Sequence, residues 1–256
     1  MSAGRLVGRV AIVTGGGSGI GRATAKRLAL EGARVVVGDI REEAAQEVAD
    51  EIRGAGGEAI AQRVDVAAEE DARLLVARTT ETFGRLDVLH SNAGVLLPGS
   101  VTELSVADWR RTLDVNLTGA FLLCREAIPA MLAGGGGSII LTSSVSGIVA
   151  EPAIAAYCAT KGGLVMLAKQ MAVDYAREGI RVNAICPGWI DTPFNDPVIE
   201  RSGGRDSLQP WIDAMVPMGR QGTPDEVADA VLFLACDDSR LMTGHALVVD
   251  AGLTAQ

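Results

Sequence analysis

The sequence predicts an α/β fold built around one doubly wound, parallel sheet of seven strands, with helices on both faces. Short apolar, β-branched runs such as Arg34–Gly38 recur along the chain and have the pattern of strands buried on both faces. Segments of helical length alternate with these runs. No linker or internal repeat divides the chain, so we expect a single domain over residues 1–256.

The predicted strands end where apolar runs meet polar or turn-forming residues. They are Arg9–Thr14, Arg34–Gly38, Ala59–Val64, Leu86–His90, Ile139–Thr142, Ile180–Ile185 and His245–Asp250. Helices are expected from the first glycine turn to Glu31 and over Glu42–Ala55, Glu69–Phe83, Ser105–Asn116, Phe121–Leu132 and Tyr157–Arg177. The stretch 189–218 is rich in loop residues, and we expect it to be a mobile lid over a substrate site.

Size and charge exclude several classes of protein. A chain of 256 residues with 48% hydrophobic residues is large enough for one well-buried core. The net charge of −9 disfavours a surface for nucleic acid or for an acidic membrane. The N-terminal apolar segment is too short for a signal peptide and no run reaches membrane-spanning length, so we expect a soluble, cytoplasmic protein.

The cysteines predict neither disulfides nor a metal site. Cys124, Cys158, Cys186 and Cys236 stand far apart and form no CxxC pair. Neither His90 nor His245 stands at ligand spacing from them, so free, reduced thiols and no metal are expected. A nucleophilic role for Cys158 lacks a histidine partner.

A glycine-rich turn follows the first predicted strand and opens the first helix. Its candidate cofactor-binding residues are Gly15, Ser18, Gly19, Ile20 and Gly21. Strand, glycine turn, helix and strand form a βαβ unit, in which backbone N–H groups and the helix N-terminus can approach a pyrophosphate. The glycines alone would also fit a tight turn without a ligand, but the βαβ context favours dinucleotide binding.

Asp39 ends the second strand and predicts the choice of cofactor. A carboxylate there can accept hydrogen bonds from the adenosine ribose hydroxyls and would repel a 2′-phosphate. We therefore favour NAD over NADP, although Arg41 lies nearby. The alternative role for Asp39 is to cap the helix that begins at Glu42.

Two further strand ends carry candidate cofactor residues. Asp65 and Val66 follow the third strand, where open α/β sheets bind their ligands. Asp65 is a candidate for contact with the adenine amino group, and capping of the helix Glu69–Phe83 is the alternative. After the fourth strand, Asn92, Ala93 and Gly94 let the backbone pass close to a cofactor or simply form a turn.

The segment from Ser143 to Lys161 contains the candidate acid–base chemistry. Tyr157 and Lys161 are four residues apart on a predicted helix, so the phenol and the ammonium share one face. A nearby cation favours the phenolate and lowers the tyrosine pKa. The Ser144 hydroxyl can hydrogen-bond a reacting carbonyl or alcohol oxygen. A tyrosine and a lysine at this spacing also occur on ordinary helix surfaces.

Asn116 lies in a predicted helix, where asparagine is disfavoured unless its amide has a partner. We expect it to hold a local kink and a water molecule. A surface asparagine is the alternative.

Together these motifs resemble the short-chain dehydrogenase/reductase family over nearly the whole chain. The turn Thr14–Gly21 is similar to the family's TGxxxGxG motif, and Asn92-Ala93-Gly94 to its NAG motif. Further matches are the catalytic set Asn116, Ser144, Tyr157 and Lys161, and the turn residues Pro187, Gly188, Ile190 and Thr192. Ser91 and Ala251 depart from the family's NNAG and DGG patterns, which affects local turn geometry more than activity.

The resemblance implies a Rossmann-type fold and hydride transfer with a nicotinamide cofactor. Tyr157 would be the general base in oxidation and the acid in reduction, and Ser144 would orient the substrate oxygen. Lys161 would lower the tyrosine pKa and bind the nicotinamide ribose, while Asn116 would anchor a water for proton relay. Ile190 and Thr192 would approach the nicotinamide carboxamide. A homotetramer is also implied, with interfaces at helices 105–132 and 157–177 and at the last strand.

The substrate is predicted less sharply than the reaction. Apolar candidates for the rim of its site are Val95, Leu96, Val145, Ile148, Val149, Trp189, Phe194, Trp211 and Met215. Such a rim favours a small-molecule secondary alcohol or ketone. Arg201 and Arg205 could bind an anionic group or could be solvated loop charges. Reduction of a 3-oxoacyl thioester on a carrier protein is the alternative reaction, and a non-catalytic nucleotide sensor is the alternative class.

Overall fold

The computed structural model describes residues 4–255 and contains one seven-stranded sheet. The strand order is β3-β2-β1-β4-β5-β6-β7, and every neighbouring pair is parallel. The strands are β1 (Val10–Thr14), β2 (Arg34–Asp39), β3 (Glu58–Arg63), β4 (Val88–Ser91), β5 (Gly137–Thr142), β6 (Ile180–Pro187) and β7 (Ala246–Val249). The predicted fold class is confirmed, with strand ends displaced by no more than a few residues.

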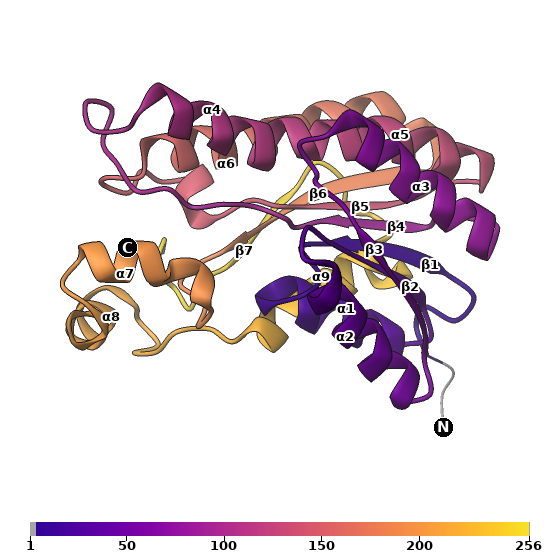
Figure 1. Ribbon diagram of the computed structural model, residues 1–256, viewed down its shortest axis with the longest axis horizontal. Helices are drawn as coiled ribbons and strands as arrows, with labels where there is room; N and C mark the ends of the chain where they lie inside the picture. The colour runs from indigo at the N-terminus through magenta and orange to yellow at the C-terminus, as the bar shows by residue number, and fades with distance from the viewer. Residues whose placement is uncertain (1–3, 256) are drawn as a thin grey trace.

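Helices cover both faces of the sheet. In Figure 1, α3 (Glu69–Phe83), α4 (Val106–Leu113), α5 (Gly119–Ala133) and α6 (Ala155–Tyr175) form one layer. The opposite layer contains α1 (Gly19–Leu30), α2 (Glu42–Gly54) and α9 (Pro224–Ala235). Parallel strands joined by crossover helices produce this doubly wound arrangement.

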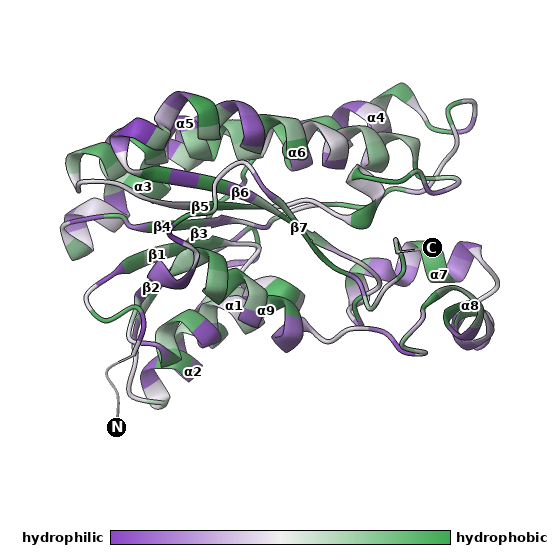
Figure 2. Cartoon of the chain, turned by 180° about the vertical axis from the view of Figure 1, so that it is seen from behind, coloured by the Kyte–Doolittle hydropathy of each residue, from purple (hydrophilic) through white to green (hydrophobic). Residues whose placement is uncertain are grey.

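Each face of the sheet has its own hydrophobic core. On β1, Ile12 packs toward α3, α5 and α6, whereas Ala11 and Val13 pack toward α1, α2 and α9. This alternation follows from the two-residue period of a strand. Because both faces are buried, the strands are almost continuously hydrophobic, as Figure 2 shows.

The two predicted helices 105–116 and 121–132 are joined into one continuous helix over Val106–Ala133. A π-helical turn at Asp114–Thr118 joins α4 to α5 and changes the direction of the side chains without ending the helix. By length and composition this helix could cross a membrane, but half of its most apolar window is buried inside the fold. Leu123, Ala127 and Met131 pack into the core, so it is a core helix.

The region after β6 is more helical than the sequence analysis predicted. Helices α7 (Asp196–Arg201) and α8 (Leu208–Met215) lie within the predicted lid, which is therefore not simply a loop. Thr223 begins α9, a helix the sequence analysis did not predict, with a complete capping box to Glu226. Helix α6 begins at Ala155, two residues before the predicted start.

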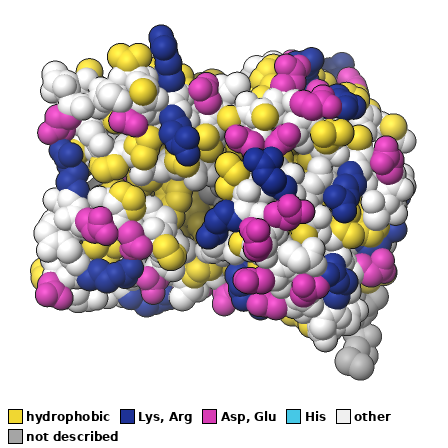
Figure 3. Space-filling view, viewed as in Figure 1, with side chains coloured by type: hydrophobic (Ala, Val, Ile, Leu, Met, Phe, Trp, Pro, Cys, Tyr) yellow, Lys and Arg dark blue, Asp and Glu magenta, His cyan; other side chains and the backbone are white. Residues whose placement is uncertain are grey.

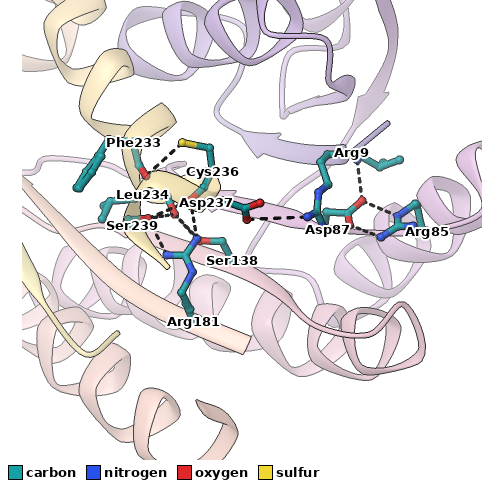
Figure 4. Close-up of polar contacts among 11 residues, drawn as sticks. Arg9, Arg85, Asp87, Ser138, Arg181, Phe233, Leu234, Cys236, Asp237 and Ser239 are labelled. Atoms are coloured by element: carbon teal, nitrogen blue, oxygen red, sulfur yellow. Dashed lines mark hydrogen bonds and ion pairs between the residues drawn. The ribbon is translucent and has the colours of Figure 1, made fainter. Parts of the chain in front are cut away.

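Two arginine-centred networks stabilise the sheet away from the candidate site (Figure 4). The buried Asp87 carboxylate pairs with Arg9 and Arg85 and accepts a hydrogen bond from the Val10 backbone. Arg181 on β6 donates to the carbonyls of Leu234 and Cys236 and so joins β6 to the end of α9. Both networks lie near the beginnings of strands, opposite the edge where doubly wound folds bind ligands.

Candidate active site

The candidate site lies where the sheet reverses its order, between β1 and β4. The chain proceeds outward from β1 to β2 and β3, and then returns to place β4 on the other side of β1. Such a switch point opens a crevice at the carboxyl ends of the strands. The glycine turn after β1 and the predicted residues after β4 and β5 all lie at this edge.

The glycine turn is packed so closely that side chains are excluded from it. A Cβ atom on Gly21 would lie 2.1 Å from the Gly15 carbonyl oxygen. Gly15 and Gly19 have positive φ angles of 61° and 50°, which L side chains rarely adopt. Helix α1 begins at Gly19, next to the exposed Ser18 and the half-buried Ile20. The turn therefore presents bare backbone and a helix N-terminus at the crevice.

Asp39 is buried and fixes the glycine turn to the start of α2. One carboxylate oxygen accepts a hydrogen bond from the Gly17 backbone N–H at 2.9 Å. The other accepts from the Arg41 backbone N–H at 3.0 Å, immediately before α2. The predicted capping role is thus met in part, because Asp39 satisfies a backbone donor at that helix start while also binding the turn.

Asp65 and Val66 lie on the turn that follows β3. The Asp65 side chain accepts from the Ala67 backbone N–H at 3.0 Å, and α3 itself begins after Ala68. Asp65 therefore shapes the turn and does not cap α3. The Val66 carbonyl would lie 2.9 Å from a Cβ on Gly119, so the start of α5 approaches this turn closely.

Asn92 connects the end of β1, where the glycine turn begins, to the end of β5. Its amide nitrogen donates to the Thr14 carbonyl at 3.1 Å, and its amide oxygen accepts from the Thr142 hydroxyl at 3.3 Å. The Thr14 hydroxyl in turn accepts from the Asn92 and Ala93 backbone N–H groups. Thr142 also contacts Nε2 of the fully buried His90 at 2.8 Å. These bonds hold the ends of β1, β4 and β5 in one fixed arrangement.

Asn116 lies in the π-helical turn and is buried, so the surface alternative was wrong. Its side chain exchanges two hydrogen bonds with the Val95 backbone, at 2.7 and 2.9 Å, and donates to Thr160 at 3.3 Å. The expected local distortion of the helix is confirmed. Asn116 thereby fixes the loop after β4 against α6, with its amide oxygen 3.3 Å from where a Cβ on Gly94 would lie.

Lys161 is buried beside the end of β5. Its ammonium donates to the Thr142 carbonyl at 2.6 Å and lies 5.3 Å from the centre of the Tyr157 ring. Burial lowers the pKa of Lys161 to about 8. The same helix turn therefore places the ammonium beside the phenol, as the four-residue spacing predicted.

Tyr157 is buried, and burial raises the pKa of its phenol well above the ordinary value. A hydrogen bond with the Ser144 side chain opposes this rise, and the negative charge of Glu151 adds to it. The sequence analysis predicted that Lys161 lowers this pKa, whereas in the protein alone loss of hydration is the largest effect and the net direction is upward. The phenol is therefore held in its neutral form, ready to donate a proton.

Ser144 belongs to a hydrogen-bonded chain that the sequence analysis did not predict. Its hydroxyl contacts the Ser146 hydroxyl at 3.1 Å, and Ser146 donates to the Glu151 carboxylate. Ser144 also caps the short helical turn Val145–Gly147 by accepting from the Ser146 backbone. The one available signal was a single acidic residue inside an otherwise apolar stretch, Ile148–Ala156.

The predicted residues after β6 form the remaining wall. Gly188 donates to the Val249 carbonyl at 3.0 Å, which holds the Pro187-Gly188 turn against β7. Ile190 forms a bridge to Gly222, and the Thr192 side chain lies 3.3 Å from where a Cβ on Gly19 would be. The start of the predicted lid thus contacts the glycine turn directly.

A cavity of about 180 Å³ opens beside Ser144 and Tyr157. Figure 3 shows the surface hollowed next to the lobe that contains α7 and α8, with hydrophobic side chains around the hollow. The lining comprises Leu96, Ser144, Val145, Ser146, Glu151, Pro152, Ile154, Tyr157, Gly188, Trp189, Asn195, Val198, Ser202 and Trp211.

The cavity confirms the predicted rim only in part. Four predicted residues line it, namely Leu96, Val145, Trp189 and Trp211. The other five, Val95, Ile148, Val149, Phe194 and Met215, lie outside the lining. Ile148 and Val149 are exposed on the turn after β5, whereas the Phe194 ring lies tilted by 50° against Tyr157 with ring centres 6.0 Å apart.

Both lid arginines are paired with carboxylates on the surface. Arg201 lies 2.8 Å from Glu103 and Arg205 lies 2.6 Å from Asp196. Neither lines the cavity. The interpretation as solvated loop charges is therefore supported over an anion site.

A larger groove, of about 940 Å³, follows the outer side of α1 and contains none of the predicted catalytic residues. It shares only Gly19 and Thr192 with the predicted cofactor set. Its other walls come from α1, α2 and the start of α9. The smaller cavity, which Ser144 and Tyr157 line, is therefore the candidate substrate site.

Known proteins share this sequence and fold over nearly the full chain. A family model described as enoyl-(acyl carrier protein) reductase matches residues 15–254. Cyclohexanol dehydrogenase of Acinetobacter sp. (strain SE19) is 42% identical over 249 residues, which cover 97% of this chain and 96% of that one. A 2,5-dichloro-2,5-cyclohexadiene-1,4-diol dehydrogenase of Sphingobium indicum is 41% identical over 250 residues, covering 98% of each chain.

The fold agrees equally well with a solved structure. The crystal structure of levodione reductase superposes with a TM-score of 0.94 at 34% identity, covering 98% of this chain and 99% of that one. The sequence match, the strand order and the arrangement of Ser144, Tyr157 and Lys161 agree with one another. The chain belongs to the short-chain dehydrogenase/reductase family of oxidoreductases.

Proposed function

We propose that the chain is an NAD(H)-dependent oxidoreductase that interconverts a cyclic secondary alcohol and its ketone, with Tyr157 as general acid and base. The observation that carries this proposal is the small, largely apolar cavity beside Ser144 and Tyr157. Relatives that are more than 40% identical bear the names of dehydrogenases for cyclic alcohols.

The crevice fits a nicotinamide dinucleotide. The exposed backbone of the Gly15–Gly21 turn and the start of α1 would hold the pyrophosphate. Asp39 would bind the adenosine ribose, and Asp65 and Val66 would flank the adenine. The remaining contacts would come from Asn92, Ala93, Gly94, Tyr157, Lys161, Pro187, Gly188, Ile190 and Thr192. When bound, the cofactor supplies or accepts the hydride.

The residues of the chain would manage the proton. Tyr157 would donate its proton to the carbonyl oxygen in reduction and would remove the hydroxyl proton in oxidation. Ser144 would hold that oxygen, and Lys161 would contribute positive charge beside the phenol. Because burial raises the pKa of Tyr157, we expect oxidation to become faster as pH rises. We also propose that Asn116 helps to retain a water that links Lys161 to solvent.

The size and lining of the cavity support a compact substrate. Its volume of about 180 Å³ is below the roughly 300–1,000 Å³ of pockets for drug-sized ligands. Aromatic and branched side chains, including Leu96, Trp189 and Trp211, provide flat and apolar walls for a ring. We propose that segment 189–218, with α7 and α8, acts as the lid of this cavity within a single domain.

Reduction of a 3-oxoacyl thioester is the weaker alternative. The description of the matching family model names a carrier-bound acyl substrate, although an enoyl reductase reduces a carbon–carbon double bond and not a 3-oxo group. A carrier protein is acidic, however, and would be repelled by a chain of net charge −9 unless a basic patch received it. Arg201 and Arg205 are already paired with carboxylates, which argues against such a patch on the lid.

We further propose a soluble, cytoplasmic homotetramer. Exposed apolar side chains on α4, α5 and α6, including Phe121, Met166 and Val173, offer surfaces for association. The last strand, β7, has one unpaired edge in the described chain and offers another.

Replacement of Tyr157 tests the proposed chemistry. Tyr157→Phe should lower kcat for cyclohexanol oxidation by about 10²–10⁴-fold, the usual contribution of a general acid or base. NADH binding, followed by fluorescence, should persist because the fold and the turn are intact. Tyr175→Phe is the matched control, since Tyr175 ends the same helix outside the cavity. A Tyr157→Phe enzyme with near-normal turnover would refute the assignment.

A further inference from the structure

The substrate cavity contains one charged side chain among the described residues that line it, Glu151. The other lining residues include the apolar Leu96, Val145, Ile154 and Trp211 and the polar Ser144, Ser146, Asn195 and Ser202. A carboxylate in such surroundings is costly unless hydrogen-bond donors satisfy both of its oxygens. The partners of Glu151 therefore indicate what the cavity is built to receive.

Only half of the Glu151 carboxylate is satisfied within the described part of the chain. Oε2 accepts a hydrogen bond from the Ser146 hydroxyl, which also contacts Ser144. No residue among 4–255 donates a hydrogen bond to Oε1, which is not one of the buried side-chain atoms without a partner in that part of the chain and is therefore accessible. The side chain is half-buried and its charge reaches the Tyr157 phenol, where it helps to raise the pKa. One acceptor atom near the acid–base centre is thus left for a ligand.

The backbone that carries Glu151 is held in place and strained. Ala153 has a φ angle of 58°, which non-glycine residues rarely adopt. Its carbonyl accepts from the Gly99 N–H at 2.6 Å, and the Gly99 carbonyl accepts from the Ala155 N–H at 3.1 Å. These bonds fix the turn between Glu151 and α6 to the loop after β4. A fixed turn positions an acceptor before a ligand arrives.

We propose that Glu151 recognises a second hydroxyl group on the substrate, remote from the one that reacts, so that the preferred substrates are cyclic diols or hydroxyketones. This inference rests on the proposed alcohol dehydrogenase activity and narrows it to a substrate class. Ser144 and Tyr157 would hold the reacting oxygen, and Glu151, which Ser146 joins to Ser144, would accept the second hydroxyl with its remaining oxygen. Ser146 is a positioning residue, since it orients the carboxylate and does not itself hold the substrate.

The charge and the donor count distinguish a hydroxyl from other polar groups. A substrate carboxylate would meet the like charge of Glu151 in an apolar cavity, which is unfavourable. An ammonium would be attracted by the charge of Glu151, but its three donors would meet only one free carboxylate oxygen, and the other donors would lose their hydration in the cavity. A hydroxyl has one proton to donate, and that oxygen accepts it. The site therefore favours a neutral alcohol.

The test compares substrates that differ at one position of the ring. The full-length enzyme is assayed with cyclohexanol, cyclohexane-1,4-diol, 4-hydroxycyclohexanecarboxylate and 4-aminocyclohexanol, and kcat/KM is measured for each. The variants are Glu151→Gln and Glu151→Leu. Glu200→Gln is the control, because Glu200 is an exposed acid on α7 outside the cavity lining.

In the wild type and in Glu200→Gln, kcat/KM for the diol should exceed that for cyclohexanol by about ten- to a hundredfold, the range of a hydrogen bond to a charged group. The carboxylate and the amine should be the poorest substrates. Glu151→Leu should remove the preference for the diol, and Glu151→Gln should reduce it and raise relative activity on the carboxylate. Thermal melting and NADH binding report whether each variant is folded.

Two results would overturn the inference. One is a wild type that oxidises cyclohexanol and the diol equally well or prefers the carboxylate or the amine. The other is a folded Glu151→Gln variant that keeps the wild-type ratio. A wild type that oxidises none of these alcohols with either cofactor would instead refute the proposed function, so the two failures are distinguishable.

Discussion

Removal of the negative charge at Asp39 should change which dinucleotide the enzyme uses. The carboxylate lies between the glycine turn and the start of α2, bound to the Gly17 and Arg41 backbone N–H groups. An adenosine ribose held there would present its 2′-position to this charge. Asp39→Asn removes the charge and keeps the size of the side chain, but its amide nitrogen cannot accept from one of the two backbone N–H groups, so thermal melting must show that the turn is intact.

The expected magnitude follows from the repulsion between a carboxylate and a 2′-phosphate. Two unit charges about 5 Å apart repel by about 3 kcal/mol at an effective dielectric constant of about 20. Solvent and salt at the open crevice reduce this value, and about 1.5–3 kcal/mol remains. The ratio of kcat/KM for NADP to that for NAD should therefore rise about ten- to a hundredfold. Arg41, adjacent to Asp39, would then be free to attract the phosphate.

Initial rates with cyclohexanol and each cofactor provide the assay, at low and at high salt. The wild-type preference for NAD should weaken at high salt, because exposed charges are screened. Asp50→Asn serves as the control for charge, since Asp50 is an exposed acid on α2. If Asp39→Asn leaves the ratio of the two cofactors unchanged while both still bind, the electrostatic account of cofactor choice is refuted.

Two further predictions concern stability. Burial lowers the pKa of His90 to about 3. The neutral imidazole therefore contributes fully to the free energy of unfolding above about pH 6.5. This contribution is lost as pH falls toward 3, by about 1.4 kcal/mol per pH unit. The difference in unfolding free energy between wild type and His90→Gln should shrink by about 2 kcal/mol between about pH 7 and pH 5 in urea titrations, and a constant difference would contradict this. Ala251 has a φ angle of 56°, so Ala251→Gly should stabilise the fold by about 0.5–1 kcal/mol in thermal melts. Ala55→Gly, at a φ angle of −86°, should give no such gain, and equal effects at both positions would refute strain at Ala251.

The strands and the order of the site residues were predictable because their causes are local. A strand buried on both faces must be apolar throughout, and runs such as Val10–Thr14 and Arg34–Asp39 are visible for that reason. The Gly15–Gly21 turn needs residues without side chains, and only glycine meets that need. The spacing of Tyr157 and Lys161 fixes a shared helix face.

The helices of the second half were harder to predict because tertiary packing defines them. Asn116 predicted only a local kink, and the structure shows a π-helical turn through which the helix continues while Asn116 binds Val95. Helices α7 and α8 are too short for their periodicity to be distinctive. The capping box of Thr223 and Glu226 was visible in the sequence but was not used.

The pKa of Tyr157 could not be predicted from its neighbours in sequence. A lysine four residues away indicates a lower pKa, but the depth of burial determines how much each charge costs. Burial raises the pKa of Tyr157 and lowers that of Lys161, so both groups are biased toward their neutral forms.

Glu151 shows the same difficulty for a binding residue. Val145, Ile148 and Val149 were predicted as apolar rim residues, and the single acid among residues 145–156 belonged to no motif. The position of Glu151 depends on the left-handed backbone at Ala153, which an alanine in the sequence does not predict. It also depends on the hydrogen bond from Ser146, five residues earlier. A glycine or asparagine at position 153 would have signalled the turn. The residue proposed to select the substrate is thus visible only once the strained turn has brought its carboxylate to the cavity beside Ser144 and Tyr157.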